Sequence, residues 1–194
     1  MIDSFFRSPY QKRVISPLLK WNLFRYVSPS LITLLGLVSG LLTPFLLGWH
    51  LPFLAFVTLL FSGFLDSLDG SLARKKNLTS DKGAVFDIVS DRIVESCTIL
   101  GLYAYDPTRG LLCLLMLIGI LLCVTSFLVV GVFTKNNSEK SFHYSPGLIE
   151  RAEAFIFFSL LILFPGLFTF LAALFIALMV FTTIQRTYQF YKSN

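Results

Sequence analysis

Residues 66–91 of this chain read DSLDGSLARKKNLTSDKGAVFDIVSD, and they place four aspartates between long apolar stretches. These four are Asp66, Asp69, Asp87 and Asp91. Within each pair the spacing is three or four residues, so both members lie on one face of a helix. The polar run that joins the two pairs is short, which predicts two antiparallel neighbouring helices. We therefore expect the four carboxylates to converge at one end of this helix pair.

The rest of the chain is strongly apolar. Of its 194 residues 55% are hydrophobic and 14% are charged, against about 25% charged residues in an average soluble domain. A soluble fold of this size could not cover so much apolar surface. The composition therefore predicts an all-α integral membrane protein. The cysteines, in apolar stretches without a C-x-x-C pair, are expected to be thiols of the core; they are Cys97, Cys113 and Cys123.

Six segments are long and apolar enough to be transmembrane helices. They are expected at 29–48, 51–73, 83–105, 109–134, 147–165 and 167–190. The third contains the second aspartate pair, so it must face protein or water rather than lipid. Neither an internal repeat nor a soluble domain is evident, which predicts one domain over 1–194, with a juxtamembrane segment at 1–28 and a helical bundle at 29–190.

The segment 1–28 scatters basic residues among aromatic and aliphatic ones. It lacks the continuous apolar core of a signal peptide. An amphipathic helix on the membrane surface fits this pattern, and a basic tail without fixed structure is the alternative.

The distribution of Lys and Arg predicts the orientation. With the expected spans, fifteen of the sixteen basic residues fall on one side of the membrane, and Arg109 alone falls on the other. Cytoplasmic loops carry the excess of basic residues. We therefore expect a multi-pass protein of the cell inner or plasma membrane, with both termini and the aspartate cluster on the cytoplasmic side.

Four convergent carboxylates would repel one another without a cation among them. Ligand sets of oxygen alone suit a hard divalent cation such as Mg²⁺, Mn²⁺ or Ca²⁺, and the lack of nearby His or Cys argues against zinc. Four carboxylates can hold two such ions about 3.5–4 Å apart, as in phosphoryl-transfer enzymes.

The neighbours of the aspartates have two readings each. Gly70 and Gly83 either admit a ligand close to the backbone or allow helices to pack. Arg74 is either a phosphate clamp or an arginine at the membrane surface. Glu95, one turn beyond Asp91, either pairs with a cation such as Arg92 or relays protons.

The spacing D-x-x-D-G-x-x-A-R-x8-G-x-x-x-D-x-x-x-D, present here at 66–91, resembles the signature of the CDP-alcohol phosphotransferase family, also called CDP-alcohol phosphatidyltransferases. The resemblance implies that a CDP-linked lipid, usually CDP-diacylglycerol, is attacked by a polar alcohol to give a phospholipid and CMP. It further implies Mg²⁺ or Mn²⁺ as cofactor, two ions bound by the four aspartates, and a homodimer. Asp91 then also serves as general base.

The same resemblance implies contacts to the CDP-lipid. These are expected from Pro29, Ser30, Thr33, Asp69, Gly70, Ala73, Arg74, Ser80 and Gly83. Many relatives have a Pro-Asn pair where this chain has Pro29-Ser30, so the contact from Ser30 is the one that departs from the family pattern.

Three basic residues outside the motif lie at the expected cytoplasmic helix ends: Lys135, Arg151 and Arg186. Together they could bind a phosphate on the acceptor alcohol. The run 147–151, G-L-I-E-R, is similar to an element of the family branch that makes phosphatidylinositol phosphate or archaetidylinositol phosphate. Inositol phosphate is therefore the favoured acceptor, and glycerol 3-phosphate or serine, as in phosphatidylglycerophosphate and phosphatidylserine synthases, are alternatives. Each cation could instead be a membrane-surface anchor.

Two classes outside the family remain open. An intramembrane prenyltransferase also binds a diphosphate through aspartates, but it is expected to carry two separate Asp-rich motifs. A cation transporter would place its carboxylates at the membrane midplane and show repeat symmetry. The bilayer, the CDP-lipid and the alcohol are the expected partners, and no nucleic acid is expected.

Overall fold

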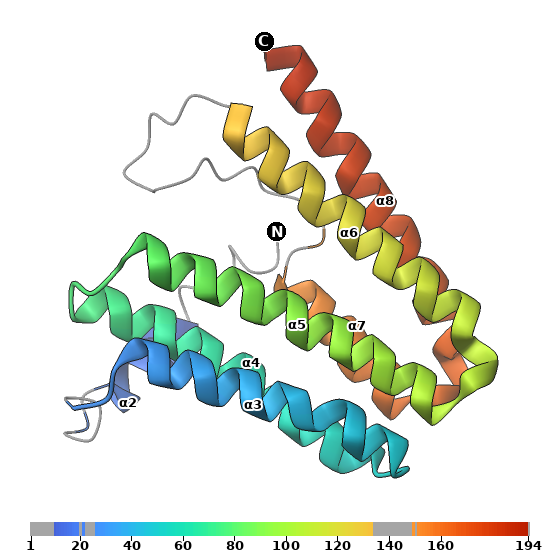
Figure 1. The fold of residues 1–194 in the computed structure, drawn as a ribbon, viewed down its shortest axis with the longest axis horizontal. Coiled ribbons are helices and arrows are strands. Elements are labelled where there is room, and N and C mark those ends of the chain that lie inside the picture. Colours follow the sequence, from blue (N-terminus) through green and yellow to red (C-terminus); the bar gives the residue numbers. More distant parts are fainter. Residues whose placement is uncertain (1–9, 20, 22–25, 134–148, 150, 194) are drawn as a thin grey trace. The chain divides into compact units, whose positions relative to one another are not determined.

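The computed structural model describes residues 10–19, 21, 26–133, 149 and 151–193, and these residues form helices joined by turns (Figure 1). No β-strand occurs in these ranges, so the all-helical expectation is confirmed. Contacts along the chain divide it into two compact units, residues 2–107 and 108–194.

The first unit contains three long helices after two short helical turns. The turns are η1 (Gln11–Ile15) and α2 (Ser16–Leu18), and the helices are α3 (Pro29–Gly48), α4 (Pro52–Lys75) and α5 (Asp81–Tyr105). Helix α3 packs against both α4 and α5 (Figure 1). The aspartate pairs lie on α4 and α5, as expected, but the extensive packing of both helices is against α3 rather than against each other.

Small residues bring α3 close to its neighbours. The buried positions of α3 are Ile32, Gly36, Ser39, Gly40, Thr43 and Leu47. The hydroxyl of Ser62 donates to the backbone oxygen of Gly36 at 2.7 Å, and that of Ser39 donates to the backbone oxygen of Thr58 at 3.0 Å. Such contacts hold helices together where lipid supplies no hydrophobic driving force between them.

The helix ends near the aspartates carry specific caps. Ser28 accepts from the backbone N–H of Leu31 at 3.2 Å, directly before Pro29 at the start of α3. Helix α4 ends with Asn77 at φ 54°, where the N–H of Leu78 donates to the oxygen of Ala73 at 2.9 Å. This is the αL end that Asn tolerates. The backbone thus turns sharply between α4 and α5.

The N-terminal segment is fastened to the end of α4. Nζ of Lys75 donates to the backbone oxygen of Leu19 at 2.6 Å, and Nζ of Lys76 donates to that of Val27 at 2.7 Å. An apolar cluster lies beside these bonds, formed by Ile15, Leu19, Ile32, Leu65, Leu68 and Leu72. Much of the expected amphipathic segment 1–28 lies outside the described residues, so the single interfacial helix is not confirmed.

The described part of the second unit has two long α-helices, a shorter one and two 3₁₀ turns. Its elements are η3 (Pro107–Arg109), α6 (Gly110–Phe133), α7 (Arg151–Leu163), η4 (Pro165–Leu167) and α8 (Phe168–Ser193). Helix α8 packs along α6 and also contacts α7 (Figure 1). Cys113 and Cys123 of α6 are buried, Cys97 of the first unit is partly buried, and none of the three is in a disulfide, as expected.

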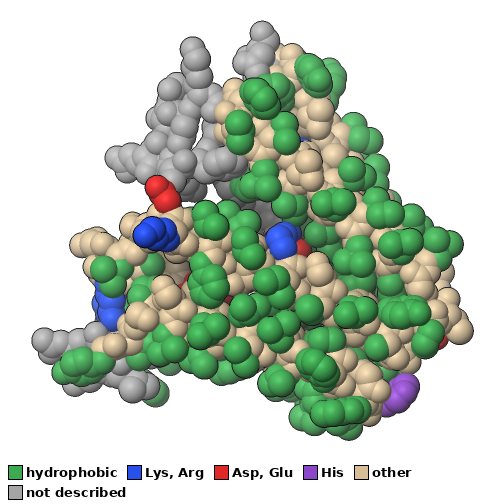
Figure 2. All heavy atoms as spheres, in the orientation of Figure 1, with side chains coloured by type: hydrophobic (Ala, Val, Ile, Leu, Met, Phe, Trp, Pro, Cys, Tyr) green, Lys and Arg blue, Asp and Glu red, His purple; other side chains and the backbone are tan. Residues whose placement is uncertain are grey.

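Within the described residues, four segments are long and apolar enough to span a membrane: Pro29–Gly48, Pro52–Lys75, Pro107–Phe133 and Pro165–Lys192. The expected third span, 83–105, is a helix over Asp81–Tyr105, but it is not among these four apolar segments, and it carries several charged residues. The expected fifth span, 147–165, is described only as the 13 residues of α7, about 20 Å at 1.5 Å per residue. The six-span count is therefore not confirmed. Hydrophobic side chains cover much of the face in Figure 2.

Candidate active site

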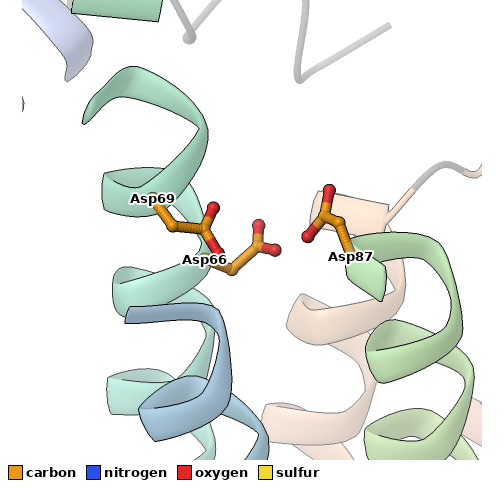
Figure 3. A group of neighbouring side chains, drawn as sticks. All are labelled: Asp66, Asp69 and Asp87. Atoms are coloured by element: carbon orange, nitrogen blue, oxygen red, sulfur yellow. The ribbon is translucent and has the colours of Figure 1, made fainter. Parts of the chain in front are cut away.

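Three of the four aspartates come together. Asp66 and Asp69 project from α4 toward Asp87 on α5 (Figure 3), and each offers one carboxylate oxygen within 4.8 Å of the others. Asp69 is buried, whereas Asp66 and Asp87 are half-buried. A donor set of carboxylate oxygens at this separation fits a hard divalent cation. The geometry thus agrees with the metal-ligand expectation for these three residues.

Asp91, the fourth aspartate, lies one turn further along α5 and is not in that group of three. It is 8% exposed. Nη2 of Arg92 lies 4.0 Å from Oδ2 of Asp91, and Nη1 of the same guanidinium lies 2.7 Å from Oε2 of Glu95. The pairing of Glu95 with Arg92 is therefore confirmed, and Arg92 stands between two acidic residues.

Thr33 connects α3 directly to the aspartate cluster. Its hydroxyl donates a hydrogen bond of 2.5 Å to Oδ2 of Asp69. The family resemblance predicts that Thr33 contacts the CDP-lipid, and sequence spacing provides no indication of this bond because its partners are 36 residues apart. A threonine one turn into α3 thus reaches a carboxylate on α4.

The other residues expected to bind the CDP-lipid lie on the same three helices as Thr33 and the aspartates. Pro29 and Ser30 form the first turn of α3, and Gly70 and Ala73 lie on α4 beyond Asp69. Ser80 caps α5 by accepting from the N–H of Gly83 at 3.1 Å, so both residues also have a structural role. They lie at the same end of the unit as the aspartates.

Arg74 is exposed and lies at the edge of a pocket. Its Nη2 donates to Oγ of Ser71 at 3.1 Å. The pocket, of about 320 Å³, is formed by α4 and the N-terminal segment and is lined by Gln11, Ile15, Ser16, Leu19, Ser71, Arg74 and Lys75. A Cβ on Gly70 would lie 3.5 Å from Nη1 of Arg74, an ordinary contact distance, so the position of this arginine does not itself require a glycine.

Two of the three expected acceptor-phosphate residues are described, both in the second unit. Arg186 is 5% exposed, and its Nη1 donates to the backbone oxygen of Cys123 at 2.9 Å and to Oγ of Ser126 at 3.2 Å. Arg151, half-buried at the start of α7, lies over the ring of Phe155 at 5.6 Å. Lys135 lies outside the described residues.

Residues that the sequence reading assigned to topology alone prove to make specific contacts. From the sequence, Lys75 and Lys76 are two of the fifteen basic residues on the expected cytoplasmic side, and in the structure each donates to a backbone oxygen of the N-terminal segment. Ser28 directly before Pro29 is a sequence signal of a helix start that could have located the beginning of α3.

Comparison with known proteins agrees with this arrangement. The sequence model of the family described as CDP-alcohol phosphatidyltransferase matches residues 26–187, which include all four aspartates. This chain belongs to that family. It is therefore a transferase of phospholipid synthesis, as expected, and the prenyltransferase and transporter alternatives fall away.

The relatives place the chain among membrane proteins. The inner membrane protein YnjF of Escherichia coli K12 is 34% identical over 178 residues, covering 85% of this chain and 84% of YnjF. The phosphatidylinositol phosphate synthase of Corynebacterium glutamicum is 28% identical over 157 residues, covering 77% of this chain and 68% of that enzyme. An integral membrane protein is thus confirmed.

Solved structures share the fold. The phosphatidylinositol phosphate synthase of Mycobacterium tuberculosis with CDP-DAG bound gives a TM-score of 0.76 at 21% identity, covering 92% of this chain and 94% of that chain. The same enzyme in complex with manganese and citrate gives 0.74 at 20% identity, covering 92% and 89%. The helical arrangement of this family member is that of a phosphatidyltransferase.

Proposed function

We propose that this protein transfers the phosphatidyl group of CDP-diacylglycerol to a phosphorylated polar alcohol and releases CMP, with inositol phosphate as the favoured acceptor. The observation that carries the proposal is the group of Asp66, Asp69 and Asp87, whose oxygens lie within 4.8 Å of one another in a chain of this family.

Asp66, Asp69, Asp87 and Asp91 would hold two Mg²⁺ or Mn²⁺ ions. Divalent ions bound there would neutralise charge on a diphosphate. The M. tuberculosis relative was crystallised with manganese, which supports this cofactor. Asp91 follows Asp87 by one turn of α5, a spacing that puts two side chains on one helix face, and we assign it as the fourth ligand on that ground.

The remaining residues bind and orient the substrate. The first turn of α3, with Pro29, Ser30 and Thr33, and the glycine positions Gly70 and Gly83 leave space for the CDP moiety beside the cluster. The Arg74 guanidinium is exposed and suited to a phosphate oxygen. Contacts from Ala73 and Ser80 complete the set that we assign to the CDP-lipid.

The chemical step needs a base at the acceptor. The acceptor oxygen attacks the phosphorus attached to diacylglycerol, its proton moves to the carboxylate of Asp91, and the bond to the CMP oxygen breaks. The guanidinium of Arg92 lies 4.0 Å from Asp91, and its positive charge partly offsets the negative charge of that carboxylate before the acceptor hydroxyl binds. Positioning of the two substrates supplies much of the rate.

The buried arginine of α8 supports a phosphorylated acceptor. The partners of Arg186 named above are neutral, so its charge is not cancelled by them. Its Nε is buried and has no hydrogen-bond partner within the described ranges. A buried cation in a membrane helix is costly, and such residues often mark the path or the site of a substrate. We assign the acceptor phosphate to Arg186, with Arg151 and Lys135 as further ligands.

Topology is part of the proposal. We infer six spans, with α5 and α7 completing the four apolar helices, an amphipathic interfacial helix before them, and both termini and the site on the cytoplasmic side. The family match runs through both compact units, which supports one functional domain over 1–194. A homodimer is proposed from the family resemblance.

The experiment that tests the acceptor is a screen of purified full-length protein with CDP-diacylglycerol and Mn²⁺. Inositol phosphate, glycerol 3-phosphate, serine and inositol are added separately, and CMP is measured. We expect the highest kcat/KM with inositol phosphate. A preference for serine or free inositol would contradict a phosphate-binding role for Arg186, and a preference for glycerol 3-phosphate would retain that role but change the acceptor.

A further inference from the structure

We infer that Thr33 is a positioning residue of the metal centre, which holds the carboxylate of Asp69 in the orientation that binds the cation. This inference rests on the proposed function, because it takes Asp69 as a metal ligand. It assigns to the Thr33 hydroxyl a role that does not require contact with the CDP-lipid.

The hydroxyl of Thr33 has two acceptors in reach but only one proton to donate. Oδ2 of Asp69 lies 2.5 Å away, whereas the backbone oxygen of Pro29 lies 3.2 Å away. A carboxylate is the stronger acceptor, and hydrogen bonds to ionised oxygens are the shorter and stronger ones. The proton therefore points at Asp69, across the gap between α3 and α4.

Asp69 needs such a partner more than the other two ligands do. It is 4% exposed, and its neighbours Leu68 and Leu72 on α4 are buried as well. A buried carboxylate is stabilised by hydrogen bonds to its charged form. An ionised carboxylate offers about four acceptor sites on two oxygens, so a carboxylate that accepts from Thr33 can also bind a cation.

The packing of α3 on α4 fixes the position of Thr33. One turn along α3, a Cβ on Gly36 would lie 3.4 Å from Cβ of Leu65, at ordinary contact distance, and the backbone oxygen of Gly36 accepts from Ser62 at 2.7 Å. This close interface keeps the Thr33 side chain facing Asp69. Hydrogen bonds from outside the ligand set orient the ligands of metal sites in this way, and their loss costs about 10- to 100-fold in affinity.

The test measures Mn²⁺ binding to the purified full-length protein in detergent, by electron paramagnetic resonance of free Mn²⁺, without CDP-lipid. We expect Thr33→Val, which keeps the shape and removes the hydroxyl, to raise the Kd for Mn²⁺ by about tenfold or more. Thr33→Ser, which keeps a hydroxyl, should bind Mn²⁺ much as the wild type does. Should Thr33→Val not fold, Thr33→Ala provides the same comparison.

Thr43→Val is the matched control on the same helix. Thr43 is buried, and its hydroxyl lies 3.3 Å from that of Thr58, away from the aspartates, so its loss should leave Mn²⁺ binding unchanged. A Thr33→Val protein that binds Mn²⁺ like the wild type but loses affinity for CDP-diacylglycerol would overturn the inference and leave Thr33 as a lipid contact. A different result would count against the metal site itself: the wild type does not bind Mn²⁺, or Asp87→Asn binds it as well as the wild type does. The role of Thr33 would then fail together with the proposed metal site.

Discussion

Arg92 and Glu95 form an ion pair in α5, with Nη1 of Arg92 2.7 Å from Oε2 of Glu95. Glu95 is 1% exposed, and the same guanidinium reaches within 4.0 Å of Asp91. One cation thus serves two acidic side chains on successive turns of a helix. Because Arg92 pairs more closely with Glu95, its electrostatic attraction to the carboxylate of Asp91 is weaker.

We predict that Glu95→Gln lowers kcat for CMP release by about tenfold, less than the 10²–10⁴-fold contributed by a general base. Without the charge of Glu95, Arg92 pairs with Asp91 alone and competes with the acceptor hydroxyl for that carboxylate. The KM for CDP-diacylglycerol should change little. Steady-state kinetics check this, with Asp81→Asn, an exposed acid on the same helix, as control. An unchanged kcat in Glu95→Gln would contradict the role of the pair.

Arg186→Gln should raise the KM for inositol phosphate by at least about tenfold, because it removes a charge-assisted phosphate contact. The KM for CDP-diacylglycerol should stay near that of the wild type. Arg109→Gln is the matched control, since Arg109 also lies over a ring, 4.4 Å from that of Phe168, and donates to a backbone oxygen at 3.1 Å. Equal acceptor KM values in the two variants would remove Arg186 from the acceptor site.

Lys76→Met should loosen the attachment of the N-terminal segment to α4. The acceptor of the hydrogen bond from Lys76 is Val27, the residue directly before the Ser28 cap of α3. Without this bond, the first turn of α3 is held less firmly against α4. We expect a loss of about 1 kcal/mol in stability, seen as a lower Tm, together with a higher KM for CDP-diacylglycerol. Lys82→Met, at an exposed lysine, is the control and should change neither quantity.

The packing of α5 on α3 predicts the effect of a single methyl group. A Cβ on Gly101 would lie 2.6 Å from Cα of Pro44 and 2.9 Å from Cδ1 of Leu47. Since a backbone atom cannot move aside alone, Gly101→Ala should destabilise the protein by about 1–3 kcal/mol. Thermal unfolding in detergent measures this. Gly166→Ala, where a Cβ would meet nothing within 4 Å, should unfold like the wild type.

Local features of the sequence were sufficient for part of the fold. Pro29 and Pro52 mark helix starts, and the turn after Lys75 contains Asn77, a residue that tolerates a positive φ. The long helices therefore lie within a few residues of their expected bounds. The aspartate spacing and the short joining run were sufficient to bring Asp66, Asp69 and Asp87 together.

Contacts between distant segments could not be read in the same way. Nothing in the spacing says that Thr33 bonds to Asp69, that Lys76 reaches Val27, or that Arg186 reaches the backbone of Cys123. Each depends on which helices are neighbours and on how they are rotated. Lysines at a membrane surface also look alike whether they anchor a helix or fasten another segment, so their roles became visible only in three dimensions.

The most direct test of the central claim measures CMP released from CDP-diacylglycerol with inositol phosphate, by wild type and Asp87→Asn, in Mn²⁺ and in chelator. We predict that the wild type releases CMP only when the metal and the alcohol are both present. Asp87→Asn should lose about a thousandfold or more, as expected from several kcal/mol of metal stabilisation. CMP release that survives the chelator or the Asp87→Asn change would contradict a metal centre built on these aspartates.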